Sequence, residues 1–465
     1  MNCNPKSEEA YKLLHEGVLA LARAEQAGIR IDVAYVEQEI LRLKLKIEQA
    51  EINFKNSKFY KDWKKSVNGE EVNVNSHTQL AHYLYDVLGY EPEKLTPSGK
   101  GTTDKEALLN LKIPEFTALL EKNKIKKLID VLEGFYGEQV DGVLHTNFNL
   151  HLVVSYRSSS SDPNMQNIPK RDEEAMQTCR KAIYPRPGHQ LLEIDFKGIE
   201  VAINACYNKD STLIKYVSDP TTDMHRDMAC QIFKLDEFNK EDPTHQVLRQ
   251  AAKNGFVFPQ FYGDYYRNCA VNTACKWGEL PQSRWKEGQG IKMNGGFLSD
   301  HFISKGIKSF NAYVEHLKKI ETDFWQNRFS EYSDWKDRWW SVYRKYGYID
   351  FLTGFRCSGV MDKKQVCNYP GQGSAFHCLL WSLTRADEVM QEEQWDTNII
   401  GQIHDSILFD VHPDELEHVA EIVQDITTKQ LPEFWKWIIV PLSVDMEITE
   451  VDEPWSEKKK YSLQA

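Results

Sequence analysis

The sequence predicts an α+β protein in which an antiparallel sheet is built from two separated stretches of chain. Strand-like patterns occur at Val143–Val154 and Gln190–Phe196, and they return at Tyr348–Thr353 and Asn398–Val411. The chain between these two stretches has mainly helical periodicity, from Ile199 to Tyr346. We therefore expect a long helical insertion to divide the segments that form the sheet.

The first third of the chain is predicted to be helical. Apolar residues recur at helical spacing through residues 11–55, with a break at Gly28, and again through 79–88 and 115–136. Ser76 precedes the second of these segments in an N-cap position. After the insertion, a further long helix is expected at Gly373–Glu392.

Composition indicates a folded protein that stays inside the cell. Hydrophobic residues make up 41% and aromatic residues 12% of the 465 residues, too many for a disordered chain. No apolar run of about 18 residues exists, and the polar N-terminus lacks the features of a secretory signal. The nine cysteines show neither paired nor zinc-type spacing, which indicates reduced thiols in an intracellular compartment.

Charge alone leaves the binding partner open. The net charge of −12 disfavours a polyanionic partner. Residues 42–65 nevertheless hold eight Lys or Arg against three acids, and a second basic cluster spans 122–127. Either cluster is equally explained by a solvated helix face.

Two aspartates are candidates for a metal site. Asp195 lies near the end of an apolar strand, and Asp405 lies between two apolar runs in a pattern typical of a hairpin. Phosphoryl transfer with two divalent ions needs at least two carboxylates on a rigid platform. Taken alone, each aspartate is more commonly an ordinary turn or capping residue.

A third segment combines cations with aromatic rings. Arg249 and Lys253 are four residues apart, as are Phe258 and Tyr262, so each pair shares a helix face. Such a face suits a nucleoside triphosphate, with phosphates beside the cations and base and sugar against the rings. The alternative is a solvated basic turn followed by buried aromatic residues.

In their order along the chain, these segments resemble family A DNA polymerases of the Klenow-fragment type. Asp195–Glu200 is similar to motif A, Arg249–Gly263 to motif B, and His404-Asp405 to motif C. Three further segments of the family are matched in the same order: Tyr156–Pro169, Asp223–Arg226 and Asn368–Gly373.

The resemblance implies a right-hand polymerase fold with an antiparallel palm sheet, helical fingers and a helical thumb. It places an N-terminal segment and the thumb in residues 1–140, the palm in 141–212 and 347–465, and the fingers in 213–346. It further implies a monomer of the phage or viral type, without a 3′–5′ exonuclease domain, acting on primer-template DNA and dNTPs in the cytoplasm of a bacterial or phage-infected host.

The resemblance also implies roles for individual residues. Asp195 and Asp405 would hold two Mg²⁺ ions, with Mn²⁺ as an alternative, and Lys253 would protonate the departing pyrophosphate. The nucleotide would be bound by Arg249, Lys253, Phe258, Tyr262, His225 and Glu200, of which Glu200 would exclude a ribose 2′-OH. The DNA would be bound by Arg157, Asn167, Asn368, Gln372 and His404.

Three departures from the family pattern concern the site. Lys253 and Phe258 are five residues apart, whereas the family spacing is four. Because one extra residue turns a helix by about 100°, we expect a π-bulge or an irregularity at Pro259 to restore the face. Ser406 stands where many relatives have a second carboxylate, and Lys197 replaces a small hydroxyl residue.

Two other classes of protein remain as alternatives. A two-metal nuclease would use the same aspartates, but it would not need the segment from Arg249 to Tyr262. A non-catalytic DNA-binding module would not need Asp195 and Asp405 together.

Overall fold

The computed structural model divides the chain into two units, and it describes residues 2–463 except 68–70, 93–94, 97–98, 105–106, 109–110, 112, 170–171, 275–291 and 294–295. The first unit contains Met1–Ile29, Thr146–Gln166 and Pro185–Ala465, and the second contains Arg30–His145 and Asn167–Tyr184. The range predicted as the thumb therefore contributes its first residues to one unit and the remainder to the other. The predicted border between palm and fingers falls inside the first unit.

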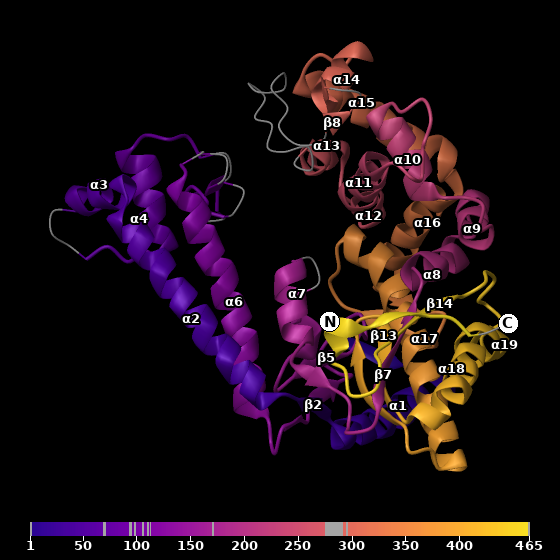
Figure 1. The fold of residues 1–465 in the computed structure, drawn as a ribbon. Coiled ribbons are helices and arrows are strands. Elements are labelled where there is room, and N and C mark those ends of the chain that lie inside the picture. Colours follow the sequence, from indigo (N-terminus) through magenta and orange to yellow (C-terminus); the bar gives the residue numbers. More distant parts are fainter. Residues whose placement is uncertain are drawn as a thin grey trace. The chain divides into compact units, whose positions relative to one another are not determined.

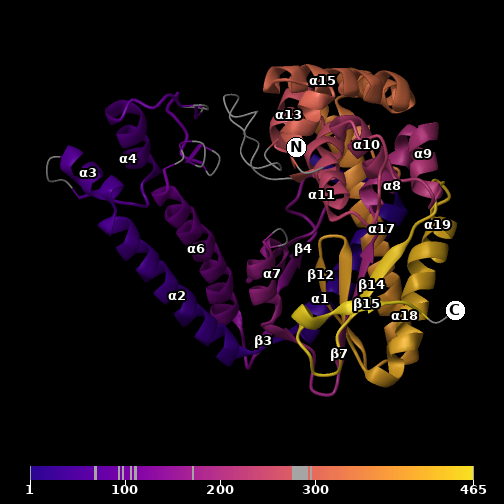
Figure 2. The same cartoon turned by 45° about the horizontal axis from the view of Figure 1, so that its top comes forward.

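An antiparallel five-stranded sheet organises the first unit, in the order β12-β13-β7-β14-β15 (Figures 1 and 2). The strands span Gln190–Phe196 (β7), Asn398–Ile403 (β12), Ser406–Val411 (β13), Val444–Ile448 (β14) and Lys459–Tyr461 (β15). The central strand β7 occupies the predicted range, and six of its seven residues are buried, as expected for a strand covered on both faces. The predicted α+β class with an antiparallel sheet is confirmed.

Two long helices pack beside this sheet. Helix α1 (Glu8–Ala27) contacts both β12 and α17 (Lys363–Glu393). A Cβ at Gly17 would lie 2.8 Å from a Leu380 methyl carbon, so the absence of a side chain at Gly17 lets the two helices approach closely. Helix α17 begins ten residues before the predicted Gly373, because Asp362 caps it and Pro370 is accommodated inside it.

The predicted helical insertion between β7 and β12 is confirmed. Its α-helices are α8 (Ile199–Asn208), α9 (Ser211–Ser218), α10 (Met224–Phe233), α11 (Pro243–Ala252), α12 (Phe258–Phe261), α13 (Tyr266–Ala274), α14 (Leu298–Ser304), α15 (Phe310–Asp323) and α16 (Ser330–Tyr346). Aromatic rings form much of the core between these helices. Phe324, for example, lies 5.6 Å from the Phe261 ring and 4.7 Å from the Phe329 ring. The unusual aromatic content of this stretch is thus explained by packing.

The second unit is mainly helical, with long helices α2 (Val33–Asn56) and α6 (Glu115–Glu138) in contact. Ser76 caps α4 (His77–Ala81), as predicted, and the chain continues as the π-helix η1 (His82–Val87). Lys122 is only 4% exposed and its ammonium group lies 2.5 Å from the Glu51 carboxylate. This lysine of the basic cluster therefore has an internal partner and does not face solvent.

The predicted strand at Val143–Val154 is only partly correct. It contains two short strands, β3 (Val143–Leu144) and β4 (Asn147–Asn149), each assigned to a different small sheet. The alternation of apolar residues is too brief there to distinguish a strand from an irregular segment.

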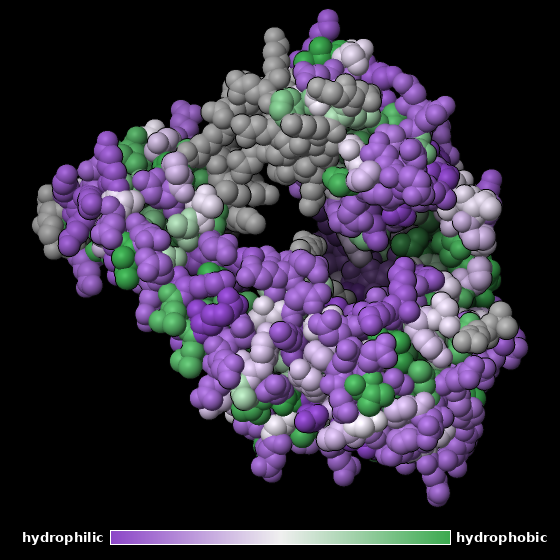
Figure 3. Space-filling view, in the orientation of Figure 1, coloured by the Kyte–Doolittle hydropathy of each residue, from purple (hydrophilic) through white to green (hydrophobic). Residues whose placement is uncertain are grey.

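Side chains on the face shown in Figure 3 are mainly hydrophilic, and the hydrophobic ones form small scattered groups. Within the part of the chain that the structure describes, no helix has both the length and the apolar character needed to cross a bilayer.

Candidate functional site

The two predicted metal ligands lie side by side at one end of the palm sheet. Asp195 is the penultimate residue of β7, and its register partner on β13 is Ser406. Asp405 immediately precedes Ser406, and its carbonyl oxygen accepts a hydrogen bond of 3.2 Å from the Phe196 amide. Asp195 near the end of β7 and Asp405 directly before β13 are therefore neighbours at the same end of the sheet.

The predicted hairpin is confirmed, because His404 and Asp405 form the two-residue turn between β12 and β13. His404 has a φ of 57°, a left-handed conformation that suits the tight turns joining antiparallel strands. Its side chain is exposed at the turn, whereas Asp405 is half-buried. The hairpin thus presents one carboxylate at the end of the central strand.

Ser406 does not replace the missing second carboxylate. It is 1% exposed, and its hydroxyl donates to the Ile403 carbonyl oxygen at 2.8 Å. On the other side of β7, Asp195 is paired in register with Asp445, whose carboxylate lies 2.8 Å from the Lys197 ammonium group. Lys197, the third departure from the family pattern, is therefore held in an ion pair.

Glu200 forms hydrogen bonds with two other predicted site residues. It lies in the first turn of α8, where the helix dipole favours a carboxylate. Its two oxygens accept hydrogen bonds from the Arg157 guanidinium and the Tyr262 hydroxyl. Burial and the negative charge of Glu200 raise the pKa of Tyr262. The Arg157 guanidinium also lies 4.0 Å from the Asp405 carboxylate, so this arginine links the sheet to α8.

The expected π-bulge is present in the fingers helix. Residues Lys253–Val257 form the π-helix η3, which is followed by the four-residue helix α12. The wider turn absorbs the extra residue. Phe258 consequently lines a cavity, whereas the preceding Val257 is fully buried in the core.

The predicted phosphate-binding residues form a cluster around Phe258. The Arg249 guanidinium donates to the Asp223 carboxylate at 2.7 Å. The Lys253 ammonium lies 5.2 Å from the centroid of the Phe258 ring, and the centroid of the His225 ring lies 5.7 Å from the same Phe258 centroid. Burial, together with the Lys253 and Arg249 charges, lowers the pKa of His225 to about 4. Its Nδ1 atom is buried and makes no hydrogen bond within the described residues.

A cavity of about 250 Å³ gathers residues from five separate parts of the chain. Its lining includes seven residues that the sequence singles out: Arg157, Glu200, Phe258, Tyr262, Asn368, Gln372 and Asp405. The Asn368 amide donates to the Tyr262 carbonyl oxygen at 3.3 Å, which joins α17 to the end of α12. Asn167 and His404 do not line this cavity, and Asn167 belongs to the second unit.

Asn204 is a polar lining residue that was not predicted. Asn204 lies one turn after Glu200 on α8, and its Oδ1 atom is buried without a hydrogen bond among the described residues. A Cβ at Gly371 would lie 2.3 Å from this oxygen, so only glycine leaves room for the amide. The four-residue spacing from Glu200 is the signal that could have identified it.

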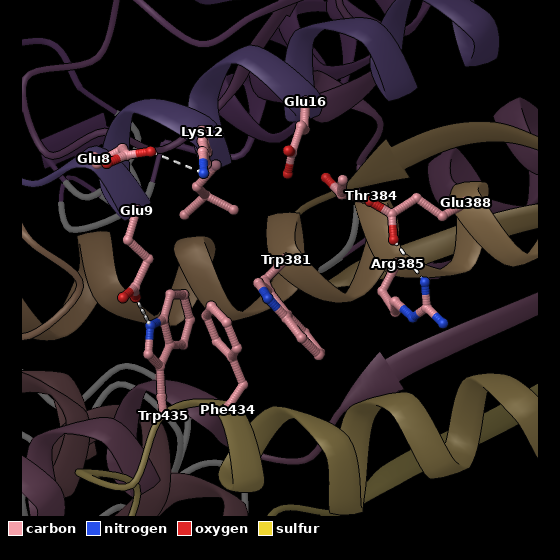
Figure 4. A pocket seen from close by; sticks show the side chains of 11 residues that line it. Glu8, Glu9, Lys12, Glu16, Trp381, Thr384, Arg385, Glu388, Phe434 and Trp435 are labelled. Carbon is pink, nitrogen blue, oxygen red and sulfur yellow. Dashed lines mark hydrogen bonds and ion pairs between the residues drawn. The ribbon is translucent and has the colours of Figure 1, made fainter.

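A larger cavity, of about 570 Å³, is formed by α1, α17 and the segment at Phe434-Trp435 (Figure 4). Trp381, Phe434 and Trp435 line one side. Four glutamates but only two cationic side chains surround it. This excess of negative charge makes the larger cavity unsuitable for a polyanion.

The donors at the sheet end suit hard divalent cations, which prefer carboxylate oxygens. Asp195 and Asp405 lie at this end of the sheet, whereas the Ser406 hydroxyl is bonded to a backbone carbonyl and the Asp445 carboxylate is paired with Lys197. Within the described residues, no group of three or more His, Cys, Asp or Glu side chains is arranged to hold a metal.

The sequence is similar to bacterial DNA polymerases. It is 26% identical to the thermostable DNA polymerase I of Thermus thermophilus, an alignment that covers 96% of this chain and 49% of that protein. It is 28% identical to DNA polymerase I of Lactococcus lactis subsp. cremoris, over 84% of this chain and 40% of the relative. This chain thus spans about half, or less, of the length of these relatives.

The fold is similar to a solved structure, the POL domain of Pol1 from M. smegmatis in complex with DNA primer-template and dNTP. The TM-score is 0.73 and the identity 24%, with 96% of this chain and 70% of the other covered. Residues 43–279 and 308–456 match the profile of DNA polymerase family A, a region that contains the described cavity and both aspartates. The chain therefore belongs to DNA polymerase family A.

Proposed function

We propose that this chain is a template-directed DNA polymerase that adds dNTPs to a primer 3′-OH. The observation that carries this proposal is the cavity that brings Asp405, Glu200 and Tyr262 together beside the cationic cluster at Arg249 and Lys253. A nucleotidyl transferase needs carboxylates and phosphate-binding cations on opposite sides of one nucleotide.

Asp195 and Asp405 would hold two Mg²⁺ ions, for which Mn²⁺ could substitute. When bound, such ions supply positive charge that neutralises phosphate oxygens and lowers the pKa of an attacking hydroxyl. The role of the protein is to keep the two carboxylates adjacent. Hydrogen bonding of β7 to β13 on one side and β14 on the other supports that role.

Arg249 and Lys253 would bind the triphosphate. They lie one turn apart, and burial together with the Arg249 charge lowers the pKa of Lys253. A lysine with a lowered pKa gives up its proton more readily, which suits protonation of the departing pyrophosphate. His225 would act as a neutral hydrogen-bonding group toward the phosphates, since its pKa of about 4 leaves it uncharged near pH 7.

Glu200, Phe258 and Tyr262 would bind the sugar and the base. Glu200 is anchored by both Arg157 and Tyr262, so it would occupy a defined volume where a ribose 2′-OH would otherwise fit. Arg157, Asn368 and Gln372 line the same cavity and would contact the minor groove of the duplex, whose hydrogen-bond acceptors are shared by A·T and T·A pairs. We propose that Asn167 and His404, whose side chains are exposed, also contact the DNA.

The polymerase would act as a monomer on primer-template DNA inside the cell, where dNTPs are available. The test is extension of a primed template by a single nucleotide in the presence of Mg²⁺. Extension directed by the template base supports the proposal. Shortening of the primer without extension would indicate the two-metal nuclease, and DNA binding without either reaction would indicate a binding module.

A further inference from the structure

The short helix that carries Phe258 cannot be positioned by its own hydrogen bonds alone. Helix α12 has four residues, is preceded by the π-helix η3, and contains Pro259, which lacks an amide hydrogen. Within it, Tyr262 donates its amide to the Phe258 carbonyl at 3.0 Å, which keeps these two residues on one face. Some other contact must set the orientation of that face.

Gln260 points away from this face, and both the nitrogen and the oxygen of its side-chain amide form hydrogen bonds. It lies about 200° around the helix from Phe258 and is 1% exposed. Its Nε2 donates to the Glu321 carboxylate at 2.5 Å, and its Oε1 accepts from the Trp325 indole at 2.7 Å. Both partners come from the helical layer formed by α15 and the π-helix η6 (Phe324–Arg328), behind α12.

Two further contacts complete the buried group. The Lys336 ammonium of α16 lies 3.0 Å from the centroid of the Trp325 ring. The Trp325 ring also packs against the Phe261 ring of α12, at a centroid distance of 6.2 Å. Helices α13 and α15 lie side by side in this layer in both views (Figures 1 and 2).

We infer that Gln260, Glu321 and Trp325 form a polar anchor that positions Phe258 and Tyr262 for nucleotide binding, an inference that rests on the proposed function. Apolar packing alone permits a helix to shift among similar arrangements, whereas a buried amide is satisfied only where donor and acceptor both meet their partners. These three are thus positioning residues, and none of them lines the cavity.

Charge exchange across the Gln260–Glu321 contact provides the test. Gln260→Glu places two carboxylates against each other, and we expect KM for the correct dNTP to rise at least about tenfold. Primer-template affinity should stay within about twofold, because the DNA contacts lie elsewhere. Combining it with Glu321→Gln restores a donor opposite an acceptor and should return KM to within about threefold of wild type. Gln391→Glu, an exposed change near the C-terminal end of α17, is the matched control and should leave KM unchanged.

The inference is overturned if folded Gln260→Glu binds dNTP as wild type does, or if the double variant is no better than the single one. If Gln260→Glu does not fold, Trp325→Phe decides the question, since it removes the indole N–H donor and keeps an aromatic ring at that position. It should raise KM for dNTP by about threefold or more, and an unchanged KM would refute the anchor. A wild-type protein that cannot extend primers would refute the proposed function instead.

Discussion

Changing Phe258 to Tyr tests the register of the fingers helix directly. Phe258 reaches the cavity only because η3 absorbs the extra residue, whereas Phe256 and Val257 are fully buried. If Phe258 lies beside the incoming sugar, wild type offers no hydroxyl there, and a dideoxynucleotide leaves a polar region of the pocket unsatisfied. Such an unmade hydrogen bond costs about 1–3 kcal/mol, a factor of roughly 5 to 150 in relative use.

The measurement is the ratio of kcat/KM for dNTP to that for ddNTP, determined for each enzyme separately. Phe258→Tyr should lower this ratio by about tenfold or more, because the new hydroxyl replaces the missing 3′-OH. Phe256→Tyr makes the same chemical change at a buried position and should leave the ratio unchanged, although the buried hydroxyl will reduce stability. A lower ratio in Phe256→Tyr or Val257→Tyr, with none in Phe258→Tyr, would refute the register.

Three further predictions concern the metal site, sugar selection and acid stability. Asp195→Asn or Asp405→Asn should reduce extension to below about 1% of wild type, while primer-template affinity changes only a few fold. Asp445→Asn, which changes a neighbouring carboxylate on β14, is the control and should keep near-normal extension. Substantial extension by Asp195→Asn or Asp405→Asn would remove that residue from the metal site. Glu200→Ala should raise the relative use of rNTPs at least about tenfold, and an unchanged rNTP/dNTP ratio would place the gate elsewhere. Burial lowers the pKa of His377 to about 3, so the unfolded state binds the proton more tightly and stability falls as pH drops below 6.5 toward 3. Between pH 7 and pH 5 the protonation of His377 should lower the free energy of unfolding by about 2 kcal/mol. The decrease in unfolding free energy over this pH range, measured by denaturant unfolding, should therefore be about 2 kcal/mol smaller in His377→Gln than in wild type.

Local signals made the sheet end and the fingers helix predictable. β7 and the Asp405 hairpin are short apolar runs bounded by polar residues, so their pattern locates the strands, whereas the resemblance to family A polymerases singled out the two carboxylates. A π-bulge or an irregularity at Pro259 was expected because Lys253 and Phe258 are five residues apart whereas the family spacing is four, and the structure contains the π-helix. By contrast, the start of α17 was missed, since Pro370 and two nearby glycines normally mark a boundary rather than a helix interior.

Other features depend on contacts between distant residues and leave no local pattern. The Asp223–Arg249 ion pair, the Asn204 amide opposite Gly371, and the burial of Lys122 each require tertiary structure. Lys122 shows the limit most clearly. A run of lysines in the sequence indicates positive charge, but only the fold distinguishes a lysine available to phosphate from one neutralised by a glutamate.

The position of the helical insertion has a consequence for how such a protein can be altered. The chain leaves the sheet after β7 and returns to it at β12. The inserted segment begins with α8, directly after β7, and ends with α17, directly before β12. Because the register of β7 with β13 is set by hydrogen bonds within the sheet, lengthening or replacing the distal helices does not shift either aspartate. Exchange of α13–α15 for the equivalent part of a relative should therefore leave the sheet-bound carboxylates in place, which makes this segment a natural unit for building chimaeric enzymes.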